Sequence, residues 1–251
     1  MQIIPLSEGV FTIDKSKIFV PFDVNKDELQ ARSSGSLLVE VQPFVVITSK
    51  DILLLDTGLG FMQKSEMQLH KNLQANGIKP SDVTKVLLSH LHKDHAGGVS
   101  YRDALGHYHL SFSNAVYYLQ QTAMNFAMDK GFPSFMTEEI SVLQQNSQVV
   151  FLDESEGNIN GYIQYKVTGA HTPHHQVFWI KENEEIIFFG ADDAPQLQQM
   201  KHRFIAKYDF DGKKAMELRQ QWWQQGNKEN WTFLFYHDVK TPYAKNTDLA
   251  V

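Results

Sequence analysis

The sequence predicts a layered α/β sandwich, and three observations lead to this fold class. Short blocks of β-branched and apolar residues alternate with helical stretches in both halves of the chain. Clusters of polar side chains directly follow several of the predicted strands, which is typical of a site at the edge of a sheet. The chain has 251 residues with 42% hydrophobic and 12% aromatic content, which is ample for one hydrophobic core. We therefore expect one domain over residues 1–251.

The first half of the chain is expected to contain strands, a helix and a polar loop. Breaks at Gln42-Pro43 and at Ser49-Lys50-Asp51 divide one apolar region into strands. Asn76-Gly77 is a typical helix C-terminus. The predicted elements are three adjacent antiparallel strands over residues 36–56, a helix over residues 61–74 and a buried strand over residues 83–88 that enters a His/Asp loop before a helix.

The second half is expected to supply the remaining strands and helices. Glu182-Asn183-Glu184 reads as the turn of a hairpin. Helices are predicted over residues 118–130, 134–145 and 212–223, and strands over residues 148–152, 163–168, 176–181, 185–190 and 231–236.

Charge and cysteine content narrow the classes of function. The formal net charge of -6 leaves no basic surface for a phosphate backbone, so no nucleic-acid partner is expected. Without any cysteine, a bound metal must be held by imidazole and carboxylate groups. Residues 1–14 lack the basic and continuously apolar regions of a signal peptide or a membrane span. We expect a cytoplasmic protein with no membrane partner.

The densest chemical signal is residues 89–98, SHLHKDHAGG, where four ligand-type side chains fall within six residues. In an extended segment, residues two apart point to the same face, so His90 and His92 can bind one metal ion. Asp94 and His95 follow where the chain turns, and they can bind a second ion a few ångströms away. This spacing predicts a site for two metal ions.

This motif resembles the H-x-H-x-D-H signature of the metallo-β-lactamase superfamily, and later segments resemble its other motifs in the same order. The matching segments are LLDTG at residues 54–58, TGAHTPHH at 168–175, IFFGADDAP at 187–195 and FLFYHD at 233–238. The resemblance implies a four-layer αββα sandwich. It also implies an enzyme similar to the lactonase and phosphotriesterase-like branch of that family.

The resemblance implies a cage of seven metal ligands. Asp192 is preferred to Asp193 as the bridging carboxylate because it comes first after its strand and keeps the family's A-D-x-x-P spacing. The implied ligands are His90, His92 and His171 for one ion, Asp94, His95 and His237 for the other, and Asp192 for both.

Two further residues are expected to support the cage without binding metal. Asp56 matches the family's strand-ending Asp, which holds the metal loop by hydrogen bonds. His175 is assigned a similar supporting role. The sequence departs from the family pattern at Ala170, which follows Gly169 directly, and at His174, which replaces a glycine. The role of His174 is therefore left open.

The implied activity is hydrolysis of a small molecule that has an apolar portion. Two divalent ions would share a bridging hydroxide that attacks the substrate, and Asp94 would act as the catalytic proton acceptor. We expect zinc, with iron or manganese as alternatives, because His92 stands where the di-iron relatives carry a carboxylate. An ester or lactone is the leading substrate class. The alternatives are a phosphodiester or phosphotriester hydrolase, a β-lactamase-like amide hydrolase, and a metal- or ligand-binding protein without turnover.

No substrate-binding residue is assigned. Acyl-homoserine lactonases of this fold carry a tyrosine three residues after the bridging Asp, and Pro195 stands at that position here. Tyr208 and Tyr236 are alternative donors. Residues 11–34 are aromatic and are expected to pack, with a lid over the metals as the alternative. The tryptophans at 222, 223 and 231 are expected in the core, with a homodimer contact as the alternative.

Overall fold

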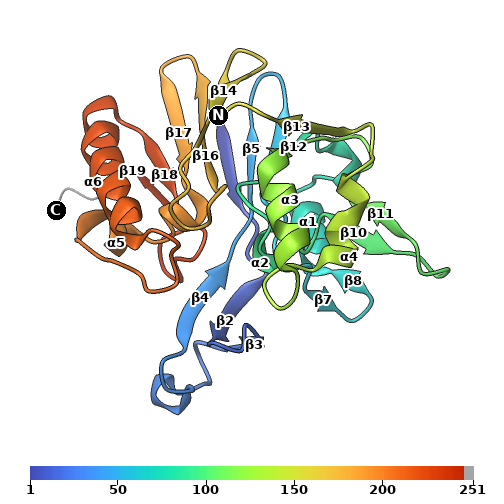
Figure 1. The fold of residues 1–251 in the computed structure, drawn as a ribbon, viewed down its shortest axis with the longest axis horizontal. Helices are drawn as coiled ribbons and strands as arrows, with labels where there is room; N and C mark the ends of the chain where they lie inside the picture. The colour runs from blue at the N-terminus through green and yellow to red at the C-terminus, as the bar shows by residue number, and fades with distance from the viewer. Residues whose placement is uncertain (246–251) are drawn as a thin grey trace.

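Two six-stranded β-sheets face each other at the centre of the fold, which we describe from a computed structural model for residues 1–245 (Figure 1). Both sheets mix parallel and antiparallel neighbours. The first consists, in spatial order, of β1 (Gln2–Pro5), β5 (Phe44–Ile47), β6 (Ile52–Leu55), β9 (Lys85–Leu87), β12 (Val116–Gln120) and β13 (Val149–Leu152). The second consists of β14 (Glu156–Ile159), β15 (Ile163–Val167), β16 (Gln176–Glu182), β17 (Glu185–Phe189), β18 (Thr232–Leu234) and β19 (Tyr243–Lys245).

Helices cover the outer faces of the two sheets (Figure 1). On the first sheet lie α1 (Gln68–Ala75), α3 (Gln121–Lys130), α4 (Thr137–Ile140) and the short helix η3 (Ser141–Leu143). On the second lie α5 (Leu197–Lys201) and α6 (Gly212–Glu229). The remaining short helices are η1 (Leu29–Ala31), η2 (Pro80–Asp82), α2 (Lys93–Ala96) and η4 (Ala191–Asp193).

Three hydrophobic cores separate these four layers. Alternate residues of a strand point to opposite faces of its sheet, so Val45 packs towards the helices while Phe44 and Val46 pack towards the second sheet. On the second sheet, Phe189 faces inward and Phe188 packs outward under α6. The predicted four-layer αββα sandwich is confirmed.

The tryptophans belong to the outer core of the second sheet. Trp222 and Trp231 are buried, and Trp223 packs against the same cluster. Their predicted place in the core is confirmed. Within residues 1–245, no helix is long and apolar enough to cross a membrane.

Three predicted helices begin later than expected, and the one predicted over residues 134–145 consists of α4 followed by η3. Residues 62–67 form a small hairpin, β7 (Met62–Gln63) and β8 (Glu66–Met67), before α1. Residues 116–120 form β12, which pairs in parallel with both β9 and β13. For residues 116–120, pairing with β9 and β13 outweighs the local preference for a helix, because a strand in the middle of a sheet forms backbone hydrogen bonds on both sides.

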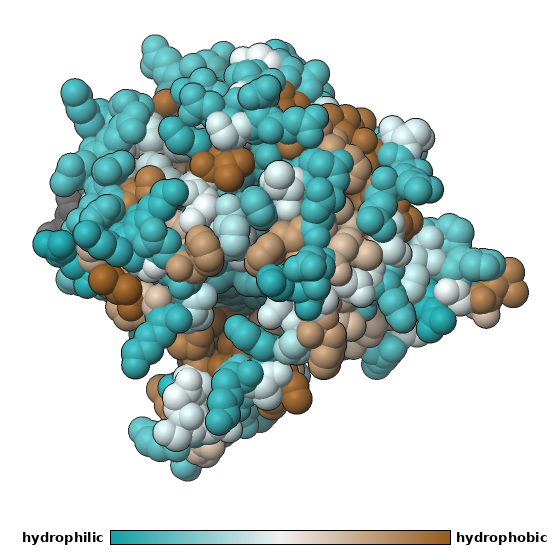
Figure 2. All heavy atoms as spheres, in the orientation of Figure 1, coloured by the Kyte–Doolittle hydropathy of each residue, from teal (hydrophilic) through white to brown (hydrophobic). Residues whose placement is uncertain are grey.

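A three-stranded sheet projects from the body as an arm (Figure 1). Its strands are β2 (Gly9–Ile13), β3 (Phe19–Pro21) and β4 (Leu37–Val41), in the order β3-β2-β4. The prediction that β4 pairs with β5 is therefore wrong, because the chain leaves one sheet for another at Gln42-Pro43. The remaining hairpin consists of β10 (Ser100–Arg102) and β11 (Tyr108–Leu110). Apolar side chains exposed on the arm are Ile18, Val20, Val24, Leu29 and Leu37, and Figure 2 shows brown atoms there.

Candidate metal centre

Histidine and aspartate side chains gather where strands of both sheets end at one edge of the sandwich. Asp56 follows β6, and His90 comes shortly after β9, the parallel neighbour of β6. Asp192 comes shortly after β17, and His237 shortly after β18, its parallel neighbour. Since parallel neighbours end at the same edge, the topology brings these distant parts of the sequence together.

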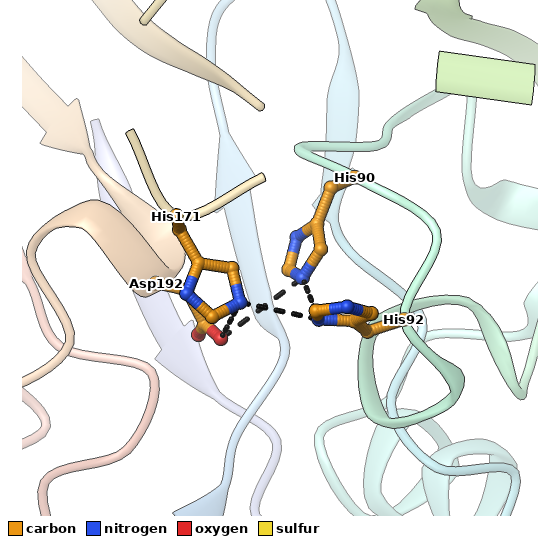
Figure 3. Close-up of side chains that lie close together, drawn as sticks. All are labelled: His90, His92, His171 and Asp192. Carbon is orange, nitrogen blue, oxygen red and sulfur yellow. Dashed lines mark hydrogen bonds and ion pairs between the residues drawn. The ribbon is translucent and has the colours of Figure 1, made fainter. Parts of the chain in front are cut away.

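The first donor group contains His90, His92, His171 and Asp192, whose side chains point toward one another (Figure 3). His92 Nδ1 lies 2.9 Å from His90 Nε2 and 3.1 Å from His171 Nε2. Asp192 Oδ2 lies 3.0 Å from His171 Nε2 and 3.9 Å from His90 Nε2. Three ring nitrogens and one carboxylate oxygen therefore converge on a small volume.

The second donor group contains Asp94, His95 and His237. Asp94 Oδ2 lies 3.7 Å from His95 Nε2 and 3.6 Å from His237 Nε2. The other oxygen of Asp192, Oδ1, lies 3.1 Å from His95 Nε2 and 2.9 Å from His237 Nε2. Asp192 thus turns one oxygen to each group, which is the arrangement of a carboxylate shared by two cations.

The imidazoles are oriented by contacts on the ring nitrogen that faces away from the site. Oxygen atoms near such nitrogens fix the ring and its tautomer, so that the other nitrogen is offered to a metal. These contacts join His90 Nδ1 to Ser89 Oγ at 3.0 Å, His95 Nδ1 to Asp56 Oδ2 at 2.7 Å, His171 Nδ1 to Asp209 Oδ1 at 2.9 Å and His237 Nδ1 to the carbonyl oxygen of Glu40 at 2.6 Å.

The protonation preferences of the cluster follow from burial and from the central carboxylate. Burial and the neighbouring imidazoles hold the pKa values of His90 and His92 well below the usual range, so both are neutral. Burial is the largest single effect on His95 and His237 as well and opposes their protonation, but the charges of Asp192 and Asp94, together with the close contact of each ring with Asp192, outweigh it and raise their pKa values. A proton on each of these two rings places positive charge beside Asp192, and a bound metal cation would supply that positive charge instead.

The donor set fits two divalent transition metals. His95 Nε2 and Asp192 Oδ1 are buried and have no hydrogen-bond partner of good geometry within residues 1–245. Buried polar atoms without a partner are costly, and atoms that converge in this way are typical of a cation site. Imidazole and carboxylate ligands suit zinc, iron and manganese.

The backbone around the centre contains two unusual conformations and one close contact. Asp56 and Ala191 have φ values of 54° and 42°, which non-glycine residues seldom adopt. Asp56 directly follows β6, and Ala191 lies between the end of β17 and Asp192. Gly98 lies so close to the Thr57 carbonyl that a Cβ there would stand 2.1 Å from its oxygen. The metal loop can pack against residues 57–60 only because residue 98 is a glycine.

The residues predicted to support the cage lie behind the ligands. Asp56 is fully buried, accepts hydrogen bonds from the backbone and side chain of Ser89, and contacts His95. The His175 ring is also buried, with its centroid 4.9 Å from that of His90 and its Nδ1 3.1 Å from Asp193 Oδ2. His174 packs against Phe126 instead.

Sequence reasoning missed a buried support behind His171. The Asp209 side chain is 1% exposed and contacts His171 Nδ1. The guanidinium of Arg219 is also buried, and it donates hydrogen bonds to the carbonyl oxygens of Asp193 and Phe204. Since 38 residues separate His171 from Asp209, no local pattern could have indicated their contact.

The two candidate tyrosines have different surroundings. Tyr236 is fully buried, stacks on His95 at a ring distance of 4.1 Å and donates its hydroxyl to the Asp94 carbonyl oxygen at 2.7 Å. The Tyr236 hydroxyl is therefore already used in a hydrogen bond within the protein. Tyr208 is 39% exposed and lies edge-on to His171 at 6.0 Å. Of the two, only Tyr208 is exposed.

A family model described as the metallo-beta-lactamase superfamily matches residues 39–192, which is more than half of the chain. The chain belongs to the metallo-β-lactamase superfamily. All seven expected ligands except His237 fall inside the matched residues. The family and the two donor groups together identify a metal-dependent hydrolase with a binuclear site.

Solved structures share the metallo-β-lactamase fold over nearly the whole chain. A probable metal-dependent hydrolase from Staphylococcus aureus has a TM-score of 0.76 at 20% identity, covering 97% of this chain and 91% of that one. The dizinc quorum-quenching lactonase AidC, in complex with its product, has a TM-score of 0.71 at 18% identity, with coverages of 97% and 89%. The hydrolase AbOPH has a TM-score of 0.73 at 23% identity, with the same coverages.

One curated relative matches over a short stretch. The N-acyl homoserine lactonase AiiB of Agrobacterium fabrum is 46% identical over 41 residues, which are 16% of this chain and 15% of that protein. The match therefore spans only a small part of the relative's length.

Proposed function

We propose that this metallo-β-lactamase-fold protein is a dizinc hydrolase that cleaves an ester or lactone in a small, partly apolar molecule. The observation that carries this proposal is the carboxylate of Asp192, whose two oxygens face two separate donor groups. In the proposed assignment, His90, His92 and His171 bind one ion. Asp94, His95 and His237 bind the other, and Asp192 is shared.

The proposed reaction adds water to the substrate carbonyl and breaks its bond to the ester oxygen. When bound, two divalent ions supply Lewis acidity and lower the pKa of a water towards neutrality. Asp94 Oδ2 lies 3.7 Å from His95 Nε2 and 3.6 Å from His237 Nε2, beyond hydrogen-bond distance, so its carboxylate can accept the proton of the attacking water. That proton then passes to the leaving alkoxide, which balances the reaction.

Aromatic side chains beside the centre support an apolar portion in the substrate. The Phe135 ring lies 5.0 Å from that of His92, and Tyr208 lies beside His171. Figure 2 shows the surface hollowed between the arm and the body. The lactonases among the similar proteins also support this substrate class.

Metal analysis tests the proposal first. Protein purified without chelator is expected to contain about two zinc ions per chain by plasma emission. Dialysis against a chelator should abolish hydrolysis of an aryl acetate and of γ-lactones, and added zinc should restore it. Protein that binds no zinc and stays inert after zinc or manganese is added would overturn the enzyme proposal in favour of a ligand-binding protein.

A substrate panel separates the proposal from its rivals. Aryl phosphodiesters, aryl phosphotriesters and a chromogenic β-lactam should turn over far more slowly than the esters and lactones. If the phosphoesters or the β-lactam were cleaved faster than the esters and lactones, the proposed activity would be phosphoester or amide hydrolysis by the same cage. A centre of this type also suits attack at phosphorus.

Asp209 is expected to strengthen zinc binding through His171. Asp209→Ala removes the contact that orients the ring, and such supporting carboxylates are worth about 10- to 100-fold in metal affinity. Competition with a chelating dye would measure the loss. Asp209→Asn keeps an acceptor without the charge and should lose less. An Asp209→Ala protein with unchanged zinc affinity would exclude this role.

A further inference from the structure

A buried pair of glutamine side chains joins the two sheets behind the metal centre. Gln120 is the last residue of β12 in the first sheet, and Gln176 is the first residue of β16 in the second. Both are buried. The side-chain Nε2 of Gln120 donates to Gln176 Oε1 at 2.9 Å and to the Glu154 carbonyl oxygen at 3.3 Å. A hydrogen bond between side chains therefore spans the two sheets at the edge that carries the ligands.

Gln176 also binds the segment that leads into the metal loop. Its side-chain Nε2 donates to the Leu88 carbonyl oxygen at 2.8 Å, and its backbone nitrogen donates to the Ser89 carbonyl oxygen at 3.0 Å. Leu88 and Ser89 lie between β9 and His90. One residue of the second sheet thus holds the chain of the first sheet immediately before the first ligand of the motif.

Gln176 is also the anchor of the loop that carries His171. Strands β15 and β16 pair up to Gln176, and residues 168–175 connect them. Thr168 closes the base of this loop, because its backbone nitrogen and its Oγ1 donate to the His175 carbonyl oxygen at 2.8 and 2.9 Å. The position of His171 relative to the first sheet therefore depends on where Gln176 is held.

The amide of Gln176 constrains the chain more than an apolar side chain of the same size would. Burial of a polar side chain costs free energy unless its atoms are hydrogen-bonded, and a fully bonded buried network fixes one arrangement of its neighbours. Both Oε1 and Nε2 of Gln176 have partners, and both partners belong to the first sheet or to the loop after it. The segments of His90 and His171, whose ring centroids lie 5.1 Å apart, are thereby fixed relative to each other.

We propose that Gln176 is a positioning residue that sets the distance between His90 and His171, and thereby the affinity of the first donor group for its metal ion. This inference rests on the proposed metal-dependent hydrolysis, in which both histidines bind the same ion. Groups that orient metal ligands change metal affinity by about 10- to 100-fold. Gln176 acts through the backbone of the two segments and not through a ring nitrogen.

Gln176→Met tests this role, because methionine has a similar length but no amide group. The affinity for one of the two zinc ions should fall about 10- to 100-fold, as measured by competition with a chelating dye, and the affinity for the other should stay nearly unchanged. Gln120→Met leaves the bond from Gln176 to Leu88 in place, so it should weaken the same ion only about threefold. If Gln176→Met does not fold, Gln120→Met provides the same comparison with a smaller effect.

Gln148→Met is the matched control. The Gln148 side chain donates to the carbonyl oxygens of Ser113 and Ala115 at 2.8 and 2.9 Å, where β12 and β13 begin, at the edge of the sheet opposite to the metal centre. This variant should lower the free energy of unfolding without changing zinc affinity. The visible absorption of bound Co²⁺ follows its coordination geometry, so it should change in Gln176→Met and not in Gln148→Met.

Hydrogen exchange of the metal-free protein separates this inference from the proposed reaction. The backbone amide of residue 176, which donates to Ser89, should exchange about tenfold faster in Gln176→Met than in the wild type, and at the wild-type rate in Gln148→Met. If the protein binds no zinc but this difference is observed, the hydrolase proposal fails and the positioning of the two segments by Gln176 stands. A folded Gln176→Met protein whose zinc affinity is unchanged, or falls no more than that of Gln148→Met, would refute the positioning role while leaving the hydrolase intact.

Discussion

Asp192→Ala is expected to lower kcat/KM by about 10³-fold or more and to reduce the zinc content from about two ions per chain to about one or fewer. The side chain turns its oxygens to both donor groups, so one substitution removes a ligand from each. His95 and His237 would also lose the negative charge that their nitrogens face. Plasma emission and steady-state kinetics on the same preparation would measure both effects.

Two control variants make the Asp192 result specific. Asp192→Asn keeps the volume and one acceptor oxygen, and it should retain more zinc than the alanine variant. Asp129→Ala removes an exposed carboxylate of α3 and should change neither zinc content nor activity. An Asp192→Ala protein that is folded by circular dichroism, binds about two zinc ions and remains active would rule out the shared-ligand assignment.

Asp56→Ala is expected to damage both stability and activity. The buried carboxylate accepts hydrogen bonds from Ser89 N and Ser89 Oγ, each at 2.7 Å, and contacts His95 Nδ1 at the same distance. Alanine leaves these buried groups without a partner, which costs about 3–5 kcal/mol. Loss of the orienting contact to His95 should also lower kcat/KM by about 10- to 100-fold. Denaturant unfolding of the chelated protein and kinetics of the loaded protein would measure the two effects.

Asp56→Asn separates the structural role from the chemical one. Asparagine tolerates the φ of 54° and can still accept from Ser89 N. Its amide group would donate to His95 Nδ1, which moves the ring proton to Nε2 and spoils that nitrogen as a metal ligand. We expect most of the stability to return while the activity stays low. An Asn variant with full activity would contradict control of the His95 tautomer by Asp56.

The ligand cluster could be anticipated because its members occupy short motifs at strand ends. His90, His92, Asp94 and His95 are close in sequence, and β-strands of one sheet deliver their following residues to a common edge. The structure brings together all seven residues that the sequence nominated, although their binding of metal stays a prediction. The supporting contact of Asp209 depends on how a distant loop folds back over His171, which no local pattern encodes.

The parts of the fold that escaped prediction depend on partners far away in the chain. Residues 116–120 become a strand because β9 and β13 pair with them on both sides. The change of sheet at Pro43 depends on β2, which takes β4 as its neighbour in the arm. The arm in turn brings the Phe19 ring to within 5.7 Å of Lys93 Nζ in the metal loop, and no sequence motif indicated this contact.

The ligands are divided between the two sheets, and this division has a mechanical consequence. His90, His92, Asp94 and His95 follow a strand of the first sheet, whereas Asp192 and His237 follow strands of the second. Metal ions bound by both sets would cross-link the two sheets at this edge of the sandwich. A ligand that binds only the folded state raises the free energy of unfolding by about 4 kcal/mol when its concentration exceeds Kd a thousandfold. The catalytic ions would therefore also stabilise the fold.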